Sequence, residues 1–359
     1  MDKKKLLALL SFLVFAAVVI FVLTAPAEEP SVNAPSTPTG TALSEDLTIH
    51  FIDVGQADCA LIQQGDFTML IDGGNVDDGQ LVVTYLTNNG IEELDYVVCT
   101  HAHEDHVGGL PSVLAVFPTD NILSPTRTYS SRCFDDFMYY ADQQRLEVRI
   151  PSPGDIIEVS DDLDITVLGP VKDYAETNDT SIVLMVRYGD TKFLFTGDME
   201  VTAENDMLDY WGEEVDWNVD VLKSGHHGSS TSSGYRFIYE TDPEYVVISV
   251  GKDNSYGHPH REIVKLYQDA GLPMFRTDEL GTVIATSDGI TVTMTWENQN
   301  AAPADVQPGE AVTYIGNVNS KKFHGPDCDS LPSEKNQIVF DSYDEAIDAG
   351  YTPCGSCLG

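Results

Sequence analysis

A histidine-rich run near residue 100 contains the residues best suited to chemistry in this chain. His101, His103, Asp105 and His106 fall within six positions, directly after the apolar run 96–99. Imidazole nitrogens are good ligands for zinc and similar ions, and carboxylate oxygens suit harder ions. Four such side chains in so short a loop are more than one tetrahedral ion usually accepts. The spacing therefore predicts two adjacent metal ions rather than a solvated polar loop.

Two later segments supply further side chains of the ligand type. Asp198 follows the apolar run 193–196 and a glycine, where an ionised carboxylate needs a charged partner such as a shared cation. His226 and His227 come soon after the strand-like run 219–223. Five of the nine histidines of the chain thus lie in two loops, which indicates a single site.

We expect the chain to position these loops with two similar halves. Each half is predicted to contain a hairpin, a helix and a strand that leads into one of the histidine loops, so the pattern favours an α/β fold with two packed sheets flanked by helices. The expected strands are 47–53, 59–63, 67–71, 96–99, 182–187, 193–196, 219–223, 245–249, 274–276, 281–286 and 290–295, and the expected helices are 80–89, 201–210 and 261–270.

Residues 46–297 resemble the metallo-β-lactamase superfamily, and within it the ComEC-like branch of competence-protein hydrolase domains. The histidine-rich run, the Thr-Gly-Asp sequence that ends at Asp198 and the later histidine pair carry this resemblance. It implies an αββα sandwich with two divalent metal ions, zinc or manganese, at one edge of the sheets. Further matching strings are 50–58, 70–74, 221–229 and 256–259.

The resemblance also implies a set of metal ligands in which Asp198 serves both ions. One histidine of the later pair completes the set, and His226 is favoured. Many members of the superfamily carry another metal-binding histidine between the first motif and Asp198, which this chain lacks, so the first ion is expected to be more open or more weakly held. The first ion would take His101, His103 and Asp198, and the second Asp105, His106, Asp198 and His226.

Hydrolysis of a phosphodiester is the reaction that this resemblance implies. A metal-bound hydroxide would attack phosphorus, while Asp105 and Asp198 orient the ions and accept a proton. Lys223 could instead be an ordinary salt-bridge lysine, and His258, which precedes a proline, could be an ordinary loop residue. The candidates for binding the phosphate or protonating the leaving group are Lys223, His227, Ser229 and His258.

Two further acids lie close to these motifs. Asp58 and Asp72 are expected to fix loop geometry rather than to touch the substrate, with Asp72 as a hydrogen-bond partner of a metal-binding histidine.

A second, smaller metal site is predicted in residues 311–359, which follow a polar linker at 298–310. One histidine and three cysteines, two of them in a C-x-x-C pair, match a closed tetrahedral zinc site, although a disulfide to Cys328 is the alternative in an oxidising compartment. Cys133 could also form a disulfide there. The expected zinc ligands are His324, Cys328, Cys354 and Cys357.

This C-terminal segment resembles the zinc-binding domain of the Ada DNA-repair protein. Ada transfers a methyl group to one of four cysteines, whereas His324 occupies the first ligand position here, so the resemblance implies a structural or DNA-docking role. Lys321, Lys322 and Lys335 form a basic cluster that favours docking.

The N-terminus carries the signs of export. Three lysines precede an uncharged apolar run of 18 residues, 6–23, so we expect residues 1–27 to be a cleaved signal peptide or a retained membrane anchor. Residues 28–45 are rich in Ala, Pro, Ser and Thr and are expected to be a flexible tether. The rest of the chain would then lie outside the cell, secreted or anchored.

The overall charge limits the partners that the surface can attract. Lys and Arg total 19 against 58 Asp and Glu, a net charge of −39, so the surface repels phosphate backbones outside a metal site. The leading hypothesis is an exported phosphodiesterase or nuclease that acts on single-stranded or double-stranded DNA. One alternative is a phosphoesterase for a cell-envelope or small phosphodiester, and another is a non-catalytic, zinc-containing surface binding protein.

Overall fold

The computed structural model describes residues 43, 45–304, 313–325, 328, 330–340 and 343–355. The predicted signal peptide or anchor at 1–27 lies outside these residues, as do nearly all of the tether and the predicted zinc ligand Cys357. Within the described part, none of the helices has both the length and the apolar character that crossing a bilayer requires. Cys133 is buried and forms no disulfide with another described cysteine.

Eight strands form the first sheet. Antiparallel pairing joins its first five strands, and parallel pairing joins the last four. In spatial order the strands are β15 (Val292–Trp296), β14 (Val283–Ser287), β1 (Leu47–Phe51), β2 (Ala60–Gln64), β3 (Phe67–Ile71), β4 (Leu94–Val98), β5 (Thr119–Leu123) and β6 (Val148–Arg149).

Seven strands form the second sheet. The strands that lead to the second histidine loop are parallel to their neighbours, whereas the other side of the sheet is an antiparallel meander. In spatial order the strands are β13 (Met274–Arg276), β12 (Tyr245–Ile248), β11 (Val221–Lys223), β10 (Thr191–Phe195), β9 (Val183–Tyr188), β8 (Leu163–Gly169) and β7 (Ile156–Glu158).

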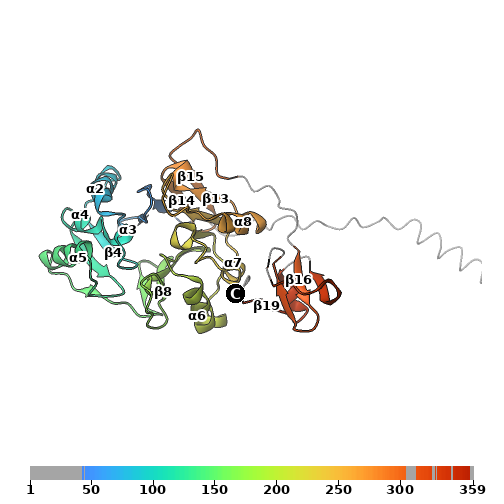
Figure 1. Cartoon of the computed structure of the whole chain (residues 1–359). Coiled ribbons are helices and arrows are strands. Elements are labelled where there is room, and N and C mark those ends of the chain that lie inside the picture. Colours follow the sequence, from blue (N-terminus) through green and yellow to red (C-terminus); the bar gives the residue numbers. More distant parts are fainter. Residues whose placement is uncertain are drawn as a thin grey trace, which may run out of the picture. The chain divides into compact units, whose positions relative to one another are not determined.

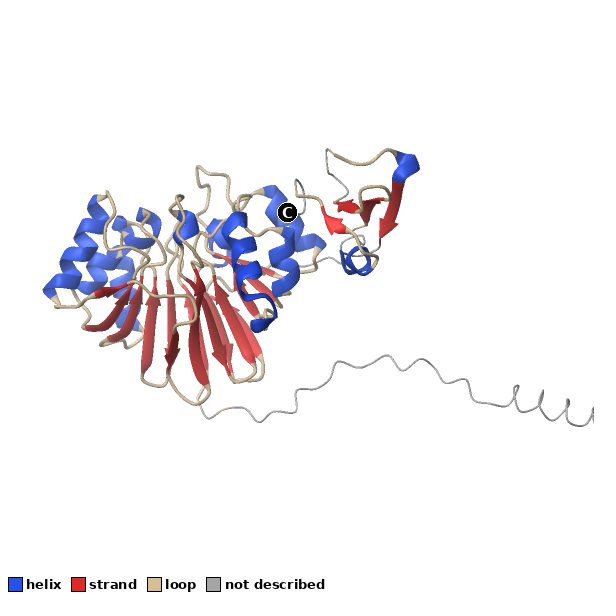
Figure 2. Cartoon of the chain, turned by 90° about the horizontal axis from the view of Figure 1, so that it is seen from below, coloured by secondary structure: helices blue, strands red, loops and turns tan. Residues whose placement is uncertain are grey.

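Helices cover the outer face of each sheet, which Figure 2 shows in blue on both sides of the strands. One cluster of buried apolar side chains joins the two sheets, and two further clusters join each sheet to its own helices. The predicted αββα sandwich is therefore confirmed. The helices are α2 (Gly79–Asn88), α3 (Glu104–Val107), α4 (Leu110–Leu114) and α5 (Arg132–Gln143) on the first sheet, and α6 (Val201–Trp211), α7 (Tyr235–Thr241), α8 (Arg261–Asp269) and α9 (Thr277–Leu280) with the second half of the chain.

The predicted strands and helices are present, with their ends shifted by up to two residues. The predicted ends lie close to the observed ones because the apolar runs are flanked by glycine and aspartate, which favour turns. The segment between the two halves is more structured than the sequence interpretation describes. Strands β5 and β6 widen the first sheet, β7 and β8 widen the second, and α5 lies between β5 and β6 in the chain. Helix α5 begins where the Ser131 hydroxyl accepts a hydrogen bond from the backbone N–H of Phe134.

The C-terminal segment forms a four-stranded sheet of its own, drawn in red in Figure 1. Its core is small and includes Phe323, Phe340 and Tyr351. In spatial order its strands are β18 (Gln337–Phe340), β16 (Tyr314–Asn317), β17 (Lys322–His324) and β19 (Thr352–Pro353), and its helix is α10 (Tyr343–Asp348).

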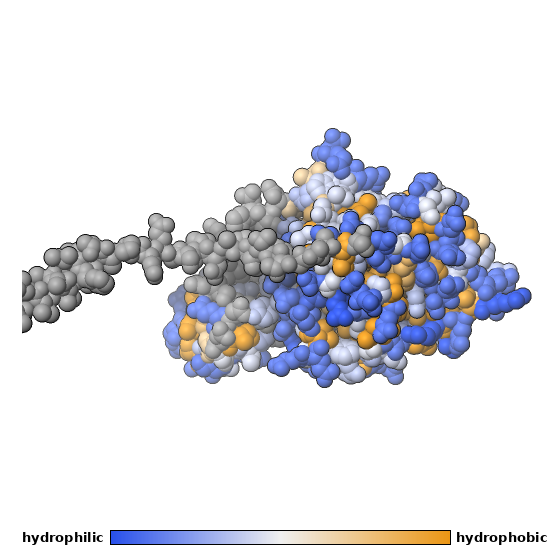
Figure 3. Space-filling model, turned by 180° about the vertical axis from the view of Figure 1, so that it is seen from behind, coloured by the Kyte–Doolittle hydropathy of each residue, from blue (hydrophilic) through white to orange (hydrophobic). Residues whose placement is uncertain are grey.

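Hydrophilic side chains dominate the face of the molecule in Figure 3, with small hydrophobic groups scattered between them. This surface agrees with the strongly negative net charge of −39.

Candidate metal centre

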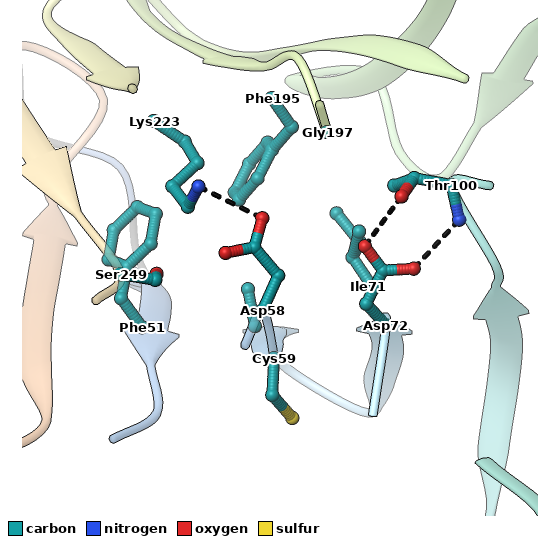
Figure 4. Close-up of a pocket in the computed structure, with 11 residues that line it drawn as sticks. Phe51, Asp58, Cys59, Ile71, Asp72, Thr100, Phe195, Gly197, Lys223 and Ser249 are labelled. Atoms are coloured by element: carbon teal, nitrogen blue, oxygen red, sulfur yellow. Dashed lines mark hydrogen bonds and ion pairs between the residues drawn. The ribbon is translucent and has the colours of Figure 1, made fainter. Parts of the chain in front are cut away.

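The first histidine loop is fixed by a buried aspartate at the end of the neighbouring strand. Asp72 follows β3, and its carboxylate accepts hydrogen bonds from the backbone N–H of Thr100 at 2.7 Å and from the Thr100 hydroxyl at 2.6 Å (Figure 4). Its Oδ2 also lies 2.8 Å from Nδ1 of His106. Because Asp72 engages Nδ1, Nε2 of His106 is left to face the site as a ligand atom. The contact agrees with the role expected for Asp72.

Four side chains converge in what we call the inner group: Asp105, His106, Asp198 and His227. Their ligand atoms all lie within 4.8 Å of one another. Nε2 of His227 is 3.2 Å from Oδ2 of Asp105 and 3.7 Å from Oδ1 of Asp198. Nε2 of His106 is 3.3 Å from the same oxygen of Asp198. Ligands about 2.1 Å from a tetrahedral ion lie about 3.4 Å apart, so the spacing fits a divalent cation.

A second set of side chains, the outer group, faces the other oxygen of Asp198. Nε2 of His101 lies 3.9 Å from Oδ2 of Asp198, and Nε2 of His226 lies 3.6 Å from it. Nδ1 of His103 is 3.1 Å from Nε2 of His101. Asp198 thus presents one carboxylate oxygen to each group, which is the arrangement expected of a residue that serves two ions.

The donor set itself fits metal ions. Nε2 of His106 and Oδ1 of Asp198 are buried and make no hydrogen bond to any described residue. Buried polar atoms without partners are rare in folded proteins unless an ion or water completes them. We therefore regard the two groups as able to hold the two cations that the sequence predicts.

The structure corrects the assignment of the histidine pair. The sequence interpretation favours His226 for the group that contains Asp105 and His106, but His227 occupies that position and His226 joins the outer group. Both histidines have a left-handed backbone, with φ of 48° and 54°, in a 3-10 turn at Gly225–Gly228. This uncommon conformation of two consecutive residues directs their rings to different oxygens of Asp198, and strained backbone of this kind is concentrated at functional sites.

His227 is held from behind by a buried ion pair. Nδ1 of His227 lies 3.0 Å from the backbone carbonyl oxygen of Ser249 and 3.2 Å from Oδ1 of Asp58. The other oxygen of Asp58 forms a 2.9 Å ion pair with Nζ of Lys223 (Figure 4). Lys223 also donates a hydrogen bond to the backbone oxygen of Ser224. Asp58 and Lys223 therefore position His227 from beneath the metal groups.

Two of the predicted substrate-binding residues do not reach the open side of the site. Lys223 is buried and committed to Asp58, so the salt-bridge interpretation is correct and a direct role for it with phosphate is not supported. Ser229 is also buried, and its hydroxyl contacts the hydroxyl of Thr231 at 3.1 Å. Neither residue lines the pocket over the metal groups.

His226 is supported by residues that the sequence interpretation did not predict. Its Nδ1 lies 3.1 Å from the hydroxyl of Thr231 and 3.5 Å from Oε1 of Glu200. The Glu200 oxygen also accepts hydrogen bonds from the side chains of Thr231 at 3.0 Å and Asn178 at 3.1 Å. Asn178 lies between the first histidine loop and Asp198, in the stretch that the sequence analysis notes for its lack of histidine.

Electrostatics within the inner group favour a cation. Burial alone would lower the pKa of His227, but the carboxylates of Asp198 and Asp58 raise it to about 10. Burial alone would raise the pKa of Asp198, but His106 and His227 hold it well below its usual value. Positive charge is thus strongly stabilised at the place where an inner ion would sit.

In the outer group, His101 differs in its protonation from His227. Burial and the neighbouring His106 hold the pKa of His101 well below its usual value, so His101 is a neutral imidazole. Neutral imidazole is the form that binds metals, so His101 needs to lose no proton before it can act as a ligand.

An open pocket of about 360 Å³ lies over both groups. His258 is one of its walls, and burial together with His227 and His226 lowers the pKa of His258 to about 4. His258 is therefore uncharged at neutral pH and can exchange hydrogen bonds without adding positive charge. The remaining lining side chains beyond the two groups are Gln56, Glu104, Asn178 and Tyr256.

The C-terminal sheet brings three of its four predicted zinc ligands together. The ligand atoms of His324, Cys328 and Cys354 lie within 4.8 Å of one another, and Nδ1 of His324 is 3.3 Å from Sγ of Cys328. Strand β17 carries His324, and Cys354 follows β19, its parallel neighbour. The arrangement fits a metal ion in a module with a small apolar core.

An αββα sandwich with these ligand groups at one edge defines a class of metal-dependent hydrolases. Residues 52–252 match the model of the metallo-beta-lactamase superfamily, and residues 308–358 match the metal binding domain of Ada. The chain belongs to the metallo-beta-lactamase superfamily and carries an Ada-type metal-binding domain at its C-terminus.

The relatives of the chain include proteins named for competence, which confirms the resemblance to the ComEC-like branch. The chain is 30% identical over 262 residues to ComE operon protein 3 of Bacillus subtilis, covering 67% of this chain and 33% of that protein. It is 30% identical over 233 residues to competence protein ComA of Neisseria gonorrhoeae, covering 64% and 31%. The chain thus spans about a third of the length of these relatives.

Among solved structures, the metallo-beta-lactamase fold protein YhfI from Bacillus subtilis matches with a TM-score of 0.45 and 14% identity. The match covers 70% of this chain and all of YhfI.

Proposed function

We propose that this hydrolase is a phosphodiesterase that uses two divalent metal ions, zinc or manganese, and that its substrate is DNA. The observation that carries the proposal is the placement of Asp198, a buried carboxylate that offers each oxygen to a different group of imidazoles. Paired metal sites of this kind are typical of enzymes that cleave phosphate esters by in-line displacement.

The residues of the site would have distinct roles in this reaction. Bound divalent ions would lower the pKa of a water molecule and polarise the phosphoryl oxygens. Asp105 has a pKa of about 2, since His106 and His227 outweigh the effect of burial, so it is ionised and able to hold an ion. Asp198 would be a ligand in both groups. His258, which lines the pocket, would form hydrogen bonds with the reacting phosphate.

DNA as the substrate is supported by the relatives and by the C-terminal module. ComE operon protein 3 and competence protein ComA are among the relatives, although the chain covers only about a third of each. In the module, Lys321 and Lys322 adjoin the predicted zinc ligand His324 and would contact phosphates as the DNA-docking role requires. The net charge of −39 then leaves this cluster and the metal ions as the main attraction for DNA.

A small phosphodiester, such as a cell-envelope head group, is the second candidate. Neither lysine nor arginine lines the described pocket over the metal groups, so the site offers no cationic track for a chain of phosphates. The metal ions alone would neutralise the charge of a single phosphate, which is all that a small phosphodiester requires.

The test is to measure bound metals in the purified chain and to assay three substrates: bis(4-nitrophenyl) phosphate, single-stranded DNA and double-stranded DNA. Asp105→Ala and Asp198→Asn serve as inactive controls. DNA cleavage that requires added metal and is lost in both variants is the expected result. Turnover of the small diester alone would favour the second candidate, and bound metal without any turnover would favour a binding protein.

We also propose that the protein acts outside the cell, secreted or anchored by residues 1–27. Separation of the culture medium from the cells, followed by protease treatment of the intact cells, tests this proposal. A secreted protein would be found in the medium, an anchored external domain would be degraded, and an internal one would be protected.

A further inference from the structure

An exposed aromatic ring stands at the mouth of the metal pocket. Tyr256 lines this pocket and is 67% exposed. One face of its ring stacks on His258, with ring centroids 5.6 Å apart and an angle of 26° between the planes. His258 in turn lies 5.5 Å from His226 and 6.3 Å from His227, measured between ring centroids. The rings form a continuous path from the ligand groups to solvent.

The loop that carries Tyr256 is fixed by its own side-chain hydrogen bonds. Oδ1 of Asn254 accepts from the backbone N–H of Tyr256 at 3.1 Å and of His258 at 3.0 Å. Nδ2 of Asn254 donates to the backbone oxygens of Gly251 at 2.9 Å and of His258 at 2.6 Å. Oε1 of Gln56 accepts from the N–H of Gly251 at 3.1 Å, which ties the loop to the first half of the chain. Tyr256 is thus presented on a braced loop.

The chemistry of the pocket favours a flat, weakly polar group at this position. The described pocket contains no lysine or arginine, and the whole chain carries a charge of −39, so long-range charge does not hold an anionic substrate here. Stacking on an aromatic ring supplies affinity without charge and tolerates any base sequence. Tyr256 is 67% exposed, and among the described residues only His258 makes a ring contact with it, so the ring is accessible to a further planar group.

We propose that Tyr256 and His258 form a stacking platform for an unpaired nucleobase beside the metal centre, so that the hydrolase prefers single-stranded over duplex nucleic acid. In a duplex the bases are stacked on each other and cannot lie on the ring without unpairing. This inference rests on the proposed phosphodiesterase function.

The experiment compares single-stranded oligonucleotides with otherwise identical strands that carry abasic residues around the cleavage site. Wild type is expected to favour the intact strand in kcat/KM, mainly through KM. In Tyr256→Ala this preference should fall about tenfold, since stacking contributes about that much per base. Tyr256→Phe keeps the ring and should retain the preference. Tyr139→Ala is the matched control, because Tyr139 is 55% exposed on α5 and does not line the pocket.

The proposal is overturned if Tyr256→Ala discriminates intact from abasic strands as wild type does, or if wild type cuts duplex and single strands equally well. Unchanged metal content and Tm exclude misfolding of the variant. If wild type cleaves no diester at all, the proposed function fails. Fluorescence anisotropy with the same labelled strands still tests the platform in that case, with about tenfold weaker binding of the intact strand to Tyr256→Ala as the supporting result.

Discussion

The inner and the outer ligand groups share Asp198 but differ in what holds their imidazoles. In the inner group, His106 contacts Asp72 at 2.8 Å and His227 contacts Asp58 at 3.2 Å, both through Nδ1. In the outer group, the described partners of Nδ1 of His101 are the hydroxyls of Thr100 and Ser181, at 3.3 and 3.5 Å, and Nδ1 of His226 has a carboxylate only at 3.5 Å, that of Glu200. Carboxylate partners orient a ligand and raise its basicity.

Among the imidazoles, that of His226 in the outer group is 23% exposed, whereas those of His101, His106 and His227 are essentially inaccessible. Ligands that are held in place lose less entropy when an ion binds, so the inner ion should bind more tightly than the outer one. This agrees with the expectation from sequence that the ion bound by His101 and His103 is the weaker. The comparison makes five predictions, which we give from the largest expected effect to the smallest.

Replacing the shared carboxylate should abolish both sites at once. Asp198→Ala is expected to lose both ions and to lower kcat/KM for bis(4-nitrophenyl) phosphate by at least about 10³-fold, because the ions contribute several kcal/mol to the transition state. Metal analysis after gel filtration provides the measurement. One ion retained at full occupancy would show that Asp198 does not bridge the groups.

Removing the charge behind His106 should affect the inner group alone. Asp72→Asn is expected to weaken the tighter metal equivalent by about 10–100-fold, the usual effect of a hydrogen-bond partner behind a metal ligand. A titration with Mn²⁺ in competition with a chelator measures the affinity of both metal equivalents. A loss of affinity in the weaker equivalent instead would contradict the assignment of the tighter one to the inner group.

Proton release should also distinguish the groups. The pKa of His227 is raised to about 10 in the metal-free protein, so an inner ion must displace its proton at neutral pH, and the affinity should rise by up to about tenfold per pH unit below that value. The lowered pKa of His101 predicts no such release from that residue. Calorimetry of Mn²⁺ binding in Tris and in HEPES measures the protons released, and we expect about one or more for the first equivalent.

The raised pKa of His227 also affects the stability of the metal-free protein. A histidine with a raised pKa stabilises the metal-free fold fully below its unfolded value near 6.5, and this contribution is lost as the pH rises through about 10. Addition of Mn²⁺ should therefore raise Tm more at pH 8.5 than at pH 6.5. An equal rise at both values would contradict the assignment of His227 to an ion.

The sequence predicted the fold and the membership of the site because both depend on strong local patterns. Apolar runs mark the strands, and the loop that carries His101 and Asp105 and the loop that carries Asp198 each come soon after such a run. Parallel strands bring their carboxyl ends to one edge of a sheet, so the loops that follow them meet. Residue type and spacing were sufficient for this part of the site.

The roles within the site depend on conformation, which the sequence does not reveal. His226 and His227 are adjacent and chemically identical, and only their left-handed backbone decides which oxygen of Asp198 each ring faces. Lys223 has the same identity whether it meets a phosphate or Asp58, and its partner lies 165 positions away in the chain. Glu200 is one of 58 acidic residues and has no distinguishing local pattern.

The smallest predicted effect is that of a substitution at Glu200. Glu200→Gln keeps the shape of the side chain but removes the charge 3.5 Å from Nδ1 of His226, so we expect the weaker metal equivalent to lose a few-fold in affinity while the tighter one is unchanged. Glu213→Gln is the matched control, since Glu213 is an exposed acid in the turn that follows α6. The competition titration that serves for Asp72→Asn measures both equivalents. If Glu200→Gln weakened the tighter equivalent, His226 would belong to the inner group after all, and the division between the two groups would have to be redrawn.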